Sequence, residues 1–212
     1  MGRPKGRSSL LIKRRKEKIM ISTYLTIAEK GYSTITIKDI ADRAEFSRGL
    51  LFYYFDSKEH IFIETLKWVN ERIAKRLEKK LSNILDSCEK LKIKLEDSFL
   101  SIKENRLFYL FYLDFLREGA RNKYFYDPNR EFNIIAITRI KELLKEGVDS
   151  GDFYKDLNIE GTAKIIKAIV DGLIIQWLFD DPEKFSYYKK LAIYNIGKLV
   201  VSNEEKFNKY FL

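Results

Sequence analysis

Two residue types, histidine and cysteine, limit the chemistry open to this chain. Its 212 residues contain one of each, His60 and Cys88. One Cys cannot form an internal disulfide, and one Cys with one His cannot supply the Cys and His ligands of a zinc site. A single imidazole also argues against a Ser–His or Cys–His catalytic pair, and His60 is expected to face solvent. No cofactor or metal is therefore expected.

An enzyme acting on a lipophilic substrate is the weaker alternative. The sequence has no phosphate-binding glycine loop, no dinucleotide fingerprint and no cluster of metal ligands. The chain is thus expected to bind its partners rather than to catalyse a reaction.

Positive charge gathers at the start of the chain. Lys and Arg number 40 against 31 Asp and Glu, a net charge of +9, and residues 1–60 hold 13 of the basic and 7 of the acidic side chains. A basic head on a nearly neutral body indicates that the head binds a polyanion. A solvated charged terminus is the alternative.

Membrane segments are not expected. The apolar stretch from Ile19 to Ala28 contains four hydroxyl side chains, and no small-residue cleavage site follows it, which argues against a signal peptide. The best later candidate, 163–179, is interrupted by Lys167 and Asp171 and falls short of a spanning helix. A cytoplasmic protein without a membrane partner is expected.

The first helix follows the basic residues. Met20, Tyr24 and Ile27 recur with helical spacing and form one apolar face. Gly31 is suited to the left-handed position that often ends a helix.

Two short helices come next. Thr36 and Asp39 have the spacing of a capping box at the start of a helix over 37–44. Ser47 can cap a second helix over about 48–54, after a connection of three or four residues. This arrangement predicts a helix-turn-helix, whose second short helix lies in the major groove of DNA.

The residues around these helices carry a family pattern. They are Glu29-Lys-Gly-Tyr32, Thr36-Ile-Lys-Asp-Ile-Ala41, Ala44-Glu-Phe-Ser-Arg-Gly49 and Leu51-Phe-Tyr-Tyr-Phe-Asp-Ser-Lys-Glu59. In order and spacing, residues 15–62 strongly resemble the TetR family of transcriptional regulators. Three residues depart from the family pattern: Glu45 replaces the usual turn glycine, Phe52 replaces a Tyr, and Ile27 stands where Phe is common.

The resemblance implies that 48–54 is the recognition helix, with Leu51 and Phe55 packed inward. Arg48 could pair with a guanine edge and Leu50 could touch a thymine methyl group. Tyr53, Tyr54, Thr36 and Lys58 are expected at phosphates, with simple packing as the alternative for the two Tyr residues. The expected DNA-binding residues are Arg3, Lys5, Arg7, Thr36, Ser47, Arg48, Gly49, Leu50, Tyr53, Tyr54 and Lys58.

The arm Gly2-Arg-Pro-Lys-Gly-Arg7 is expected to be slender and extended. Such an arm suits a narrow minor groove, whose negative potential attracts Arg. The alternative is a disordered start that touches only phosphates.

The middle of the chain is rich in aromatic residues. Eight fall between Phe108 and Tyr126. They indicate either a core or a large apolar pocket, and the resemblance favours the pocket because the family binds its inducers among these helices. The expected ligand-binding residues are Phe99, Arg106, Phe108, Phe111, Tyr112, Phe115 and Tyr126.

Cations at 106, 117, 121 and 123 bracket this aromatic segment. An apolar pocket ringed by positive charge would suit an acyl chain with an anionic head, such as a long-chain acyl-CoA. A neutral or cationic drug is the alternative ligand, and surface charge without a ligand role is the alternative reading of the four cations.

Two C-terminal helices are expected, over about 159–179 and 183–202. The first carries two apolar stripes, whereas a helix in a monomer needs only one. Two such helices from each chain could form a four-helix dimer interface. The expected dimerisation residues are Ile166, Val170, Leu173, Trp177, Ala192, Ile196 and Leu199.

The sequence thus predicts an all-α protein with a three-helix helix-turn-helix DNA-binding domain and a C-terminal helical domain for ligand binding and dimerisation. The first domain, with its basic arm, is expected over 1–56 and the second over 57–212. The expected function is a homodimeric repressor that binds an inverted-repeat operator in double-stranded DNA and is released by a lipophilic effector. The alternatives are a regulator of multidrug efflux and an architectural DNA binder without a ligand.

Overall fold

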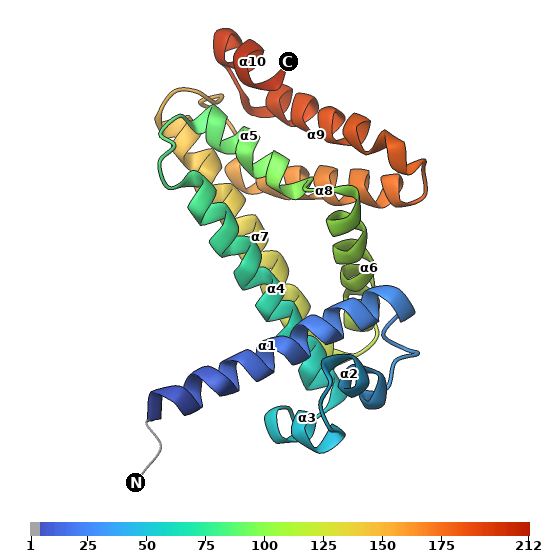
Figure 1. The fold of residues 1–212 in the computed structure, drawn as a ribbon. Coiled ribbons are helices and arrows are strands. Elements are labelled where there is room, and N and C mark those ends of the chain that lie inside the picture. Colours follow the sequence, from blue (N-terminus) through green and yellow to red (C-terminus); the bar gives the residue numbers. More distant parts are fainter. Residues whose placement is uncertain (1–4) are drawn as a thin grey trace. The chain divides into compact units, whose positions relative to one another are not determined.

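The computed structural model of this chain describes residues 5–212, with side chains from residue 9 onward. The expected all-α class is confirmed: within these residues the chain forms ten α-helices, one 3₁₀ turn and no strand beyond an isolated bridge between Phe153 and Val201 (Figure 1). The helices are α1 (Lys5–Lys30), α2 (Ile37–Ala44), α3 (Arg48–Tyr54), α4 (Lys58–Leu81), α5 (Ser87–Ser98), α6 (Ile102–Gly119), α7 (Lys123–Asp149), α8 (Ile159–Leu178), α9 (Phe185–Val200) and α10 (Glu204–Phe211), with η1 at Pro182–Lys184.

Contacts divide the described chain into two compact units. Unit 1 comprises the residues up to Arg72 together with Leu107–Asn129. Unit 2 comprises Ile73–Arg106 and Arg130–Leu212. Helices α4, α6 and α7 therefore each contribute residues to both units.

The first helix is longer than the sequence pattern suggested, and its buried face is displaced. It begins at Lys5, so Lys5 and Arg7 belong to a helix and not to an extended arm, which corrects that expectation. Ile19 and Ile27 are buried, whereas Met20 and Tyr24 are only partly buried. The hydroxyl groups of the buried Thr23 and Thr26 donate hydrogen bonds to backbone carbonyls one turn earlier in the helix. These hydrogen bonds allow polar residues to lie on the buried face.

Both short helices begin with the caps that the sequence predicts. The N–H of Asp39 donates to Thr36 Oγ1 at 3.2 Å, and the N–H of Thr36 donates to Asp39 Oδ2 at 2.8 Å. The N–H of Leu50 donates to Ser47 Oγ at 3.2 Å at the start of α3. Since α2 and α3 have the predicted bounds, the local signals alone account for this part of the fold.

Phe62 of α4 is the centre of the aromatic core of unit 1. Its ring stacks on Tyr32 with centroids 4.5 Å apart. It also makes edge contacts with Phe111 and Phe115 of α6, at 5.2 and 4.7 Å, and with Phe125 of α7, at 5.6 Å. The second half of α6 and the start of α7 therefore share one core with the helix-turn-helix.

In unit 2, α8 and α9 run side by side and are joined by η1 (Figure 1). Trp177 of α8 contacts Phe185 at 4.7 Å between ring centroids. Gly197 of α9 lies against the ring of Phe211, where an added Cβ would meet ring atoms at 2.6 Å. A glycine is thus required for α10 to pack on α9.

None of the helices described, α1 to α10, is both long enough and apolar enough to cross a membrane.

Candidate nucleic-acid interface

One face of helix α3 is packed against the rest of the chain, and the opposite face is exposed to solvent. Leu51 is fully buried and Phe55, at its C-terminal end, is 2% exposed, as the sequence predicts. On the opposite side Arg48 and Gly49 are exposed, and Tyr53 is 74% exposed. A short helix with a buried anchor and a free polar and aromatic face can enter a groove without losing its own packing.

Phe52 belongs to the exposed face of α3 and was missing from the predicted site. It is 52% exposed and stands next to the exposed Tyr53, so α3 presents two consecutive aromatic side chains. Leu50 and Tyr54 are partly buried, and the Tyr54 ring contacts that of Tyr53 with centroids 5.0 Å apart. The departure of residue 52 from the family pattern was the signal that could have marked it.

The turn between α2 and α3 tolerates an unusual residue. Glu45, where the family has glycine, adopts the left-handed conformation with φ 55°. Its carboxylate pairs with Lys18 Nζ of α1 at 2.5 Å, and this hydrogen bond lowers the pKa of Glu45. The turn geometry therefore survives the substitution, and Lys18 offsets the negative charge that Glu45 brings to this surface.

The helices of the head are joined by a second ion pair. Arg43 of α2 donates two hydrogen bonds to Glu29 of α1, both of 2.7 Å. These hydrogen bonds lower the pKa of Glu29, and both side chains are partly exposed. The bidentate geometry orients α2 on α1, while its partial exposure keeps its energetic contribution small.

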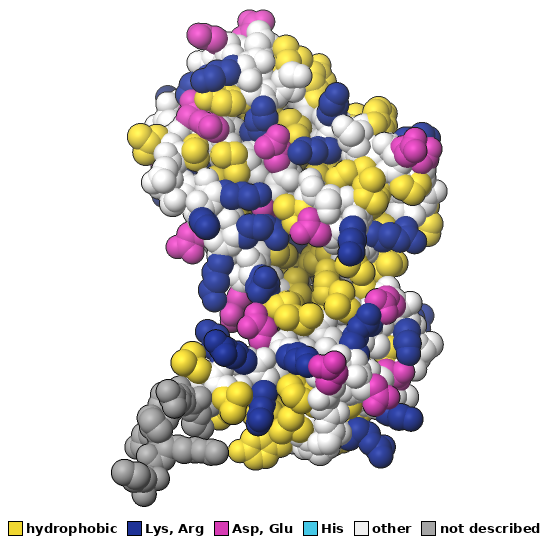
Figure 2. Space-filling view, in the orientation of Figure 1, with side chains coloured by type: hydrophobic (Ala, Val, Ile, Leu, Met, Phe, Trp, Pro, Cys, Tyr) yellow, Lys and Arg dark blue, Asp and Glu magenta, His cyan; other side chains and the backbone are white. Residues whose placement is uncertain are grey.

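Basic side chains line α1 close to this surface. Lys13 and Arg14 are exposed, and Arg15 and Lys16 are partly buried. In Figure 2, Lys and Arg side chains lie next to hydrophobic ones over α1 and the helix-turn-helix. Arg3 lies outside the described residues, and for Lys5 and Arg7 only the helical backbone is described.

The ammonium group of Lys58, expected at a phosphate, is engaged within this chain, and its phosphate role stays a prediction. Its Nζ donates to the carbonyls of Tyr32 and Ile35, at 3.0 and 2.9 Å, and lies 4.3 Å from the centroid of the Tyr32 ring. Burial lowers the pKa of Lys58. The side chain thus ties α4 to the loop after α1, because those carbonyls have few other partners in the loop.

The residues expected to bind a ligand are not all brought together. Phe111, Tyr112 and Phe115 are buried in unit 1, where Phe111 and Phe115 form the aromatic core. Phe108 stacks on Tyr112, with centroids 5.5 Å apart. Tyr126 is 56% exposed in the same unit. For Phe111 and Phe115 the structure therefore supports the core interpretation over the pocket.

The remaining two, Phe99 and Arg106, belong to unit 2. Phe99 is buried and contacts Phe185, with ring centroids 6.0 Å apart, whereas Arg106 is exposed. A ligand role for these residues stays a prediction.

Five of the seven residues expected at the dimer interface are buried within this chain, and the interface itself stays a prediction. Ile166, Val170 and Trp177 of α8 are buried within this chain, as are Ala192 and Ile196 of α9. Side chains buried in this way leave little surface for a partner subunit. The other two expected interface residues, Leu173 and Leu199, are partly exposed.

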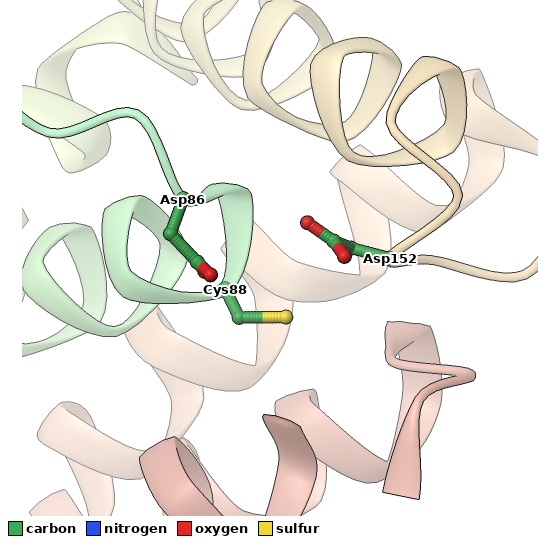
Figure 3. A group of neighbouring side chains, drawn as sticks. All are labelled: Asp86, Cys88 and Asp152. Atoms are coloured by element: carbon green, nitrogen blue, oxygen red, sulfur yellow. The ribbon is translucent and has the colours of Figure 1, made fainter. Parts of the chain in front are cut away.

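The one cysteine lies in a group of possible metal ligands. Asp86, Cys88 and Asp152 bring their ligand atoms within 4.8 Å of one another (Figure 3). Lys206 Nζ already bridges the two carboxylates, at 2.9 Å from Asp86 and 2.7 Å from Asp152. Burial, with the charges of Asp152 and Asp86, raises the pKa of the Cys88 thiol to about 12. With the Lys206 ammonium group between the two carboxylates, these side chains form an ion-paired cluster in this structure.

An all-α chain with a capped helix-turn-helix and an exposed recognition helix defines a DNA-binding regulator. The TetR family of bacterial regulatory proteins matches residues 24–65, and the C-terminal domain of the BetI-type transcriptional repressors matches residues 89–189. The chain belongs to the TetR family and is a transcriptional repressor, not an enzyme.

Curated relatives match over most of the chain. The HTH-type transcriptional repressor KstR2 of Rhodococcus jostii is 29% identical over 150 residues, which cover 69% of this chain and 71% of the relative. The fatty acid metabolism regulator protein of Bacillus subtilis is 24% identical over 189 residues, 83% of this chain and 88% of the relative.

Solved structures share the fold. A putative transcriptional regulator from Saccharomonospora viridis in complex with choline superposes with a TM-score of 0.82 at 23% identity, over 90% of this chain and all of the other. FadR from Bacillus subtilis in complex with stearoyl-CoA superposes with a TM-score of 0.73 at 21% identity, over 83% of this chain and 96% of the other.

Proposed function

We propose that this protein is a homodimeric, effector-responsive repressor that binds an inverted-repeat operator and is released from it by a lipophilic ligand. The observation that carries the proposal is the presentation of α3, with Leu51 buried and Arg48, Phe52 and Tyr53 exposed. Arg can read a guanine edge through two hydrogen bonds, and an aromatic ring can contact a thymine methyl group. A regulator of DNA acts where DNA is, which suggests the cytoplasm.

For the domain organisation we propose a DNA-binding domain over 1–56 and a regulatory domain over 57–212. The two compact units do not coincide with these two sequence ranges, because α6 and α7 each contribute residues to unit 1. A regulatory helix that shares a core with the head offers a route for a ligand to act on DNA binding. To release the operator, the ligand must bind the conformation that does not fit DNA more tightly than the one that does. A ligand with equal affinity for both conformations would not shift the equilibrium between them.

The better candidate for the dimer interface is the second apolar stripe of the predicted helix over 159–179, formed by Ile165, Ala168, Gly172, Ile175 and Phe179. Ile165 is 48% exposed and Phe179 86% exposed, and Gly172 lies between them on the same face with open space beside it. On α9, Tyr187 and Tyr194 are exposed as well. Exposed apolar residues at helical spacing favour a helix of a second copy as the occupant.

The effector is proposed from the relatives. A fatty acid metabolism regulator and a FadR structure with stearoyl-CoA favour an acyl-CoA. The regulator with choline supports a second candidate, a small cationic ligand, because aromatic side chains are abundant in unit 1 and rings attract quaternary ammonium groups.

Selection of random DNA duplexes by the purified protein tests the proposal. We expect a palindromic sequence to be enriched and to be released when a long-chain acyl-CoA is added. If choline releases it instead, the second candidate replaces the first. If no sequence is enriched, the sequence-specific regulator is wrong and an architectural DNA binder takes its place.

Two variants and one control sharpen this test. Arg48→Ala should cost about 1–3 kcal/mol at a matching guanine and relax specificity at that position. Ile165→Glu should convert the dimer to a monomer in sedimentation experiments, while Ile134→Glu, at a site 49% exposed on α7, should leave the dimer intact. A dimer that tolerates Ile165→Glu would rule out this stripe as the interface.

A further inference from the structure

Phe52 presents its ring to solvent on the recognition helix α3. Its side chain is 52% exposed, although the preceding Leu51 is fully buried and anchors the helix. Covering exposed apolar surface is favourable, because it removes that surface from water. A phenyl ring has no polar atom with which to donate or accept a hydrogen bond. The group that covers Phe52 should therefore be apolar as well.

Gly49, three positions before Phe52, is not required by the packing of the chain. Its backbone is not among the glycines in the left-handed region. Among the described residues, the nearest atom to an added Cβ would be Ser47 Oγ at 3.9 Å, an ordinary contact. Alanine is more favourable than glycine in a helix, so the missing side chain calls for a reason outside the chain. Since residues three apart are neighbours on a helix surface, Gly49 leaves a notch beside the Phe52 ring.

Positive charge accompanies this exposed ring. Arg48 is exposed one turn before Phe52 on the same helix, and Lys13 and Arg14 are exposed on α1. Residues 1–60 carry 13 basic and 7 acidic side chains. A ring presented by a basic head fits DNA better than it fits an apolar protein surface, because the phosphates supply the complementary charge.

We infer that Phe52 contacts the methyl group of a thymine in the major groove, close to the guanine that Arg48 reads, and that Gly49 lets the base edges approach the helix. The inference rests on the proposed function and specifies what α3 reads in the operator. The C5-methyl group is the apolar feature of the thymine edge in the major groove. Leu50, expected from the sequence at such a methyl group, is partly buried and is less suited to the contact.

The helix sets the spacing between the two bases. Residues 48 and 52 lie about 6 Å apart along the axis of α3. Successive bases of one DNA strand rise by about 3.4 Å. The thymine is therefore expected within about two base pairs of the guanine in each half-site.

Deoxyuridine substitution tests the inference with the full-length protein and the duplex chosen by selection. Replacing one thymine at a time by deoxyuridine removes a single methyl group and keeps every base pair. Fluorescence anisotropy should find a position near a guanine where this change weakens wild-type binding by about fourfold, the effect expected for one buried methyl group.

Two variants assign that position to a side chain. Phe52→Ala should bind the thymine operator more weakly than wild type and bind the thymine and deoxyuridine operators equally. Leu50→Ala is the matched control on the same helix and should keep the preference for thymine. Because Phe52 is exposed, Phe52→Ala should melt close to the wild-type temperature, which separates lost binding from lost folding.

Gly49→Ala tests the notch through two readouts of opposite direction. The added methyl group should keep or raise the melting temperature, because alanine favours the helix and the chain leaves room for it. It should weaken operator binding by about fivefold or more, because it occupies the space that the base edges would fill. Operator binding as tight as wild type would show that DNA does not approach Gly49 closely.

The inference is overturned if deoxyuridine at every position binds wild type as well as thymine does. It is also overturned if Phe52→Ala keeps the preference for thymine, or if Leu50→Ala abolishes it. In each of these cases an enriched operator still supports the proposed repressor. If no operator is enriched, the proposed function itself fails.

Discussion

The backbone N–H of Tyr32 donates a hydrogen bond of 2.7 Å to Oδ2 of Asp114, across 82 positions of the chain. Tyr32 follows Gly31, which ends α1 with a φ of +80°, and Asp114 belongs to α6. Oδ1 of the same carboxylate lies 3.4 Å from Arg117 Nη2. The loop between the first two helices of the head is therefore fixed to a helix that the sequence assigns to the regulatory domain.

Replacing Asp114 should loosen this attachment. We expect Asp114→Ala to lower the free energy of unfolding by about 1–2 kcal/mol, because the Tyr32 N–H would lose a charged acceptor in a partly buried site. Asp114→Asn keeps an acceptor oxygen and should cost less. Urea unfolding of the three proteins measures the difference, and equal stability of Asp114→Ala and wild type would show that the hydrogen bond contributes nothing.

Glu45 should weaken DNA binding, because it places a carboxylate beside the recognition helix and engages Lys18. Glu45→Gln removes that charge and frees Lys18 for a phosphate. We expect tighter operator binding and a slope of log K against log salt that is steeper by about one. Fluorescence anisotropy at several salt concentrations measures both quantities.

The control is Glu78→Gln, which changes the net charge equally at an exposed residue of α4 in unit 2. It should leave the salt slope unchanged. If Glu45→Gln and Glu78→Gln change operator affinity and salt slope equally, overall charge, and not the pairing of Lys18, sets the affinity.

The helix-turn-helix could be predicted from the sequence because its signals are local. Capping by Thr36 and Ser47 involves residues three positions apart, and the structure reproduces the bounds of both short helices. The role of Lys58 could not be predicted in this way. Its two carbonyl partners, at Tyr32 and Ile35, are more than 20 residues away in the chain and come close only in the folded head.

The choice between the two apolar stripes of α8 was equally beyond the sequence. Ile165 and Ile166 have the same chemistry and differ by one position, or 100° around a helix. Their exposures are 48% and 2%, because tertiary packing in unit 2 decides which stripe becomes core. Hydrophobic periodicity predicts that two faces exist and does not identify which one is covered by the same chain.

The Asp97 ion pairs should make stability depend on pH. Burial alone would raise the pKa of Asp97, but hydrogen bonds from Arg76 and Lys80 outweigh burial and hold it below its ordinary value. A carboxyl group with a lowered pKa stabilises the fold above its unfolded pKa, near about 3.9, and this stabilisation is lost as the pH falls through the lower folded value.

Asp97→Asn should therefore cost about 2–3 kcal/mol at neutral pH, since it leaves two cations beside a neutral group. The difference in free energy of unfolding between Asp97→Asn and wild type should shrink as the pH falls below about 4. Chemical denaturation at several pH values measures the gap. Asp149→Asn, at an exposed residue of α7, serves as control and should show no such gap. A gap for Asp97→Asn that stays constant down to low pH would contradict the assigned charge pairing.

Cys88 should resist alkylation in the native protein. The side chain is fully buried, and its pKa of about 12 leaves about one thiol in ten thousand ionised at pH 8, where the thiolate is the reactive form. Iodoacetamide should therefore label Cys88 only after denaturation. Rapid labelling of the folded wild-type protein would contradict the burial of this thiol.

Lys206→Met should increase the labelling rate of Cys88 and lower stability by about 1–2 kcal/mol, because Asp86 and Asp152 would lose the ammonium group that bridges them. Their repulsion favours local opening of α10 from α5, which exposes the thiol. Lys209→Met removes a lysine of the same helix whose ammonium lies over Tyr210, and it should leave labelling unchanged. Mass spectrometry of timed reactions separates the two variants, and an identical rate in both would show that Lys206 does not hold this end of unit 2 closed.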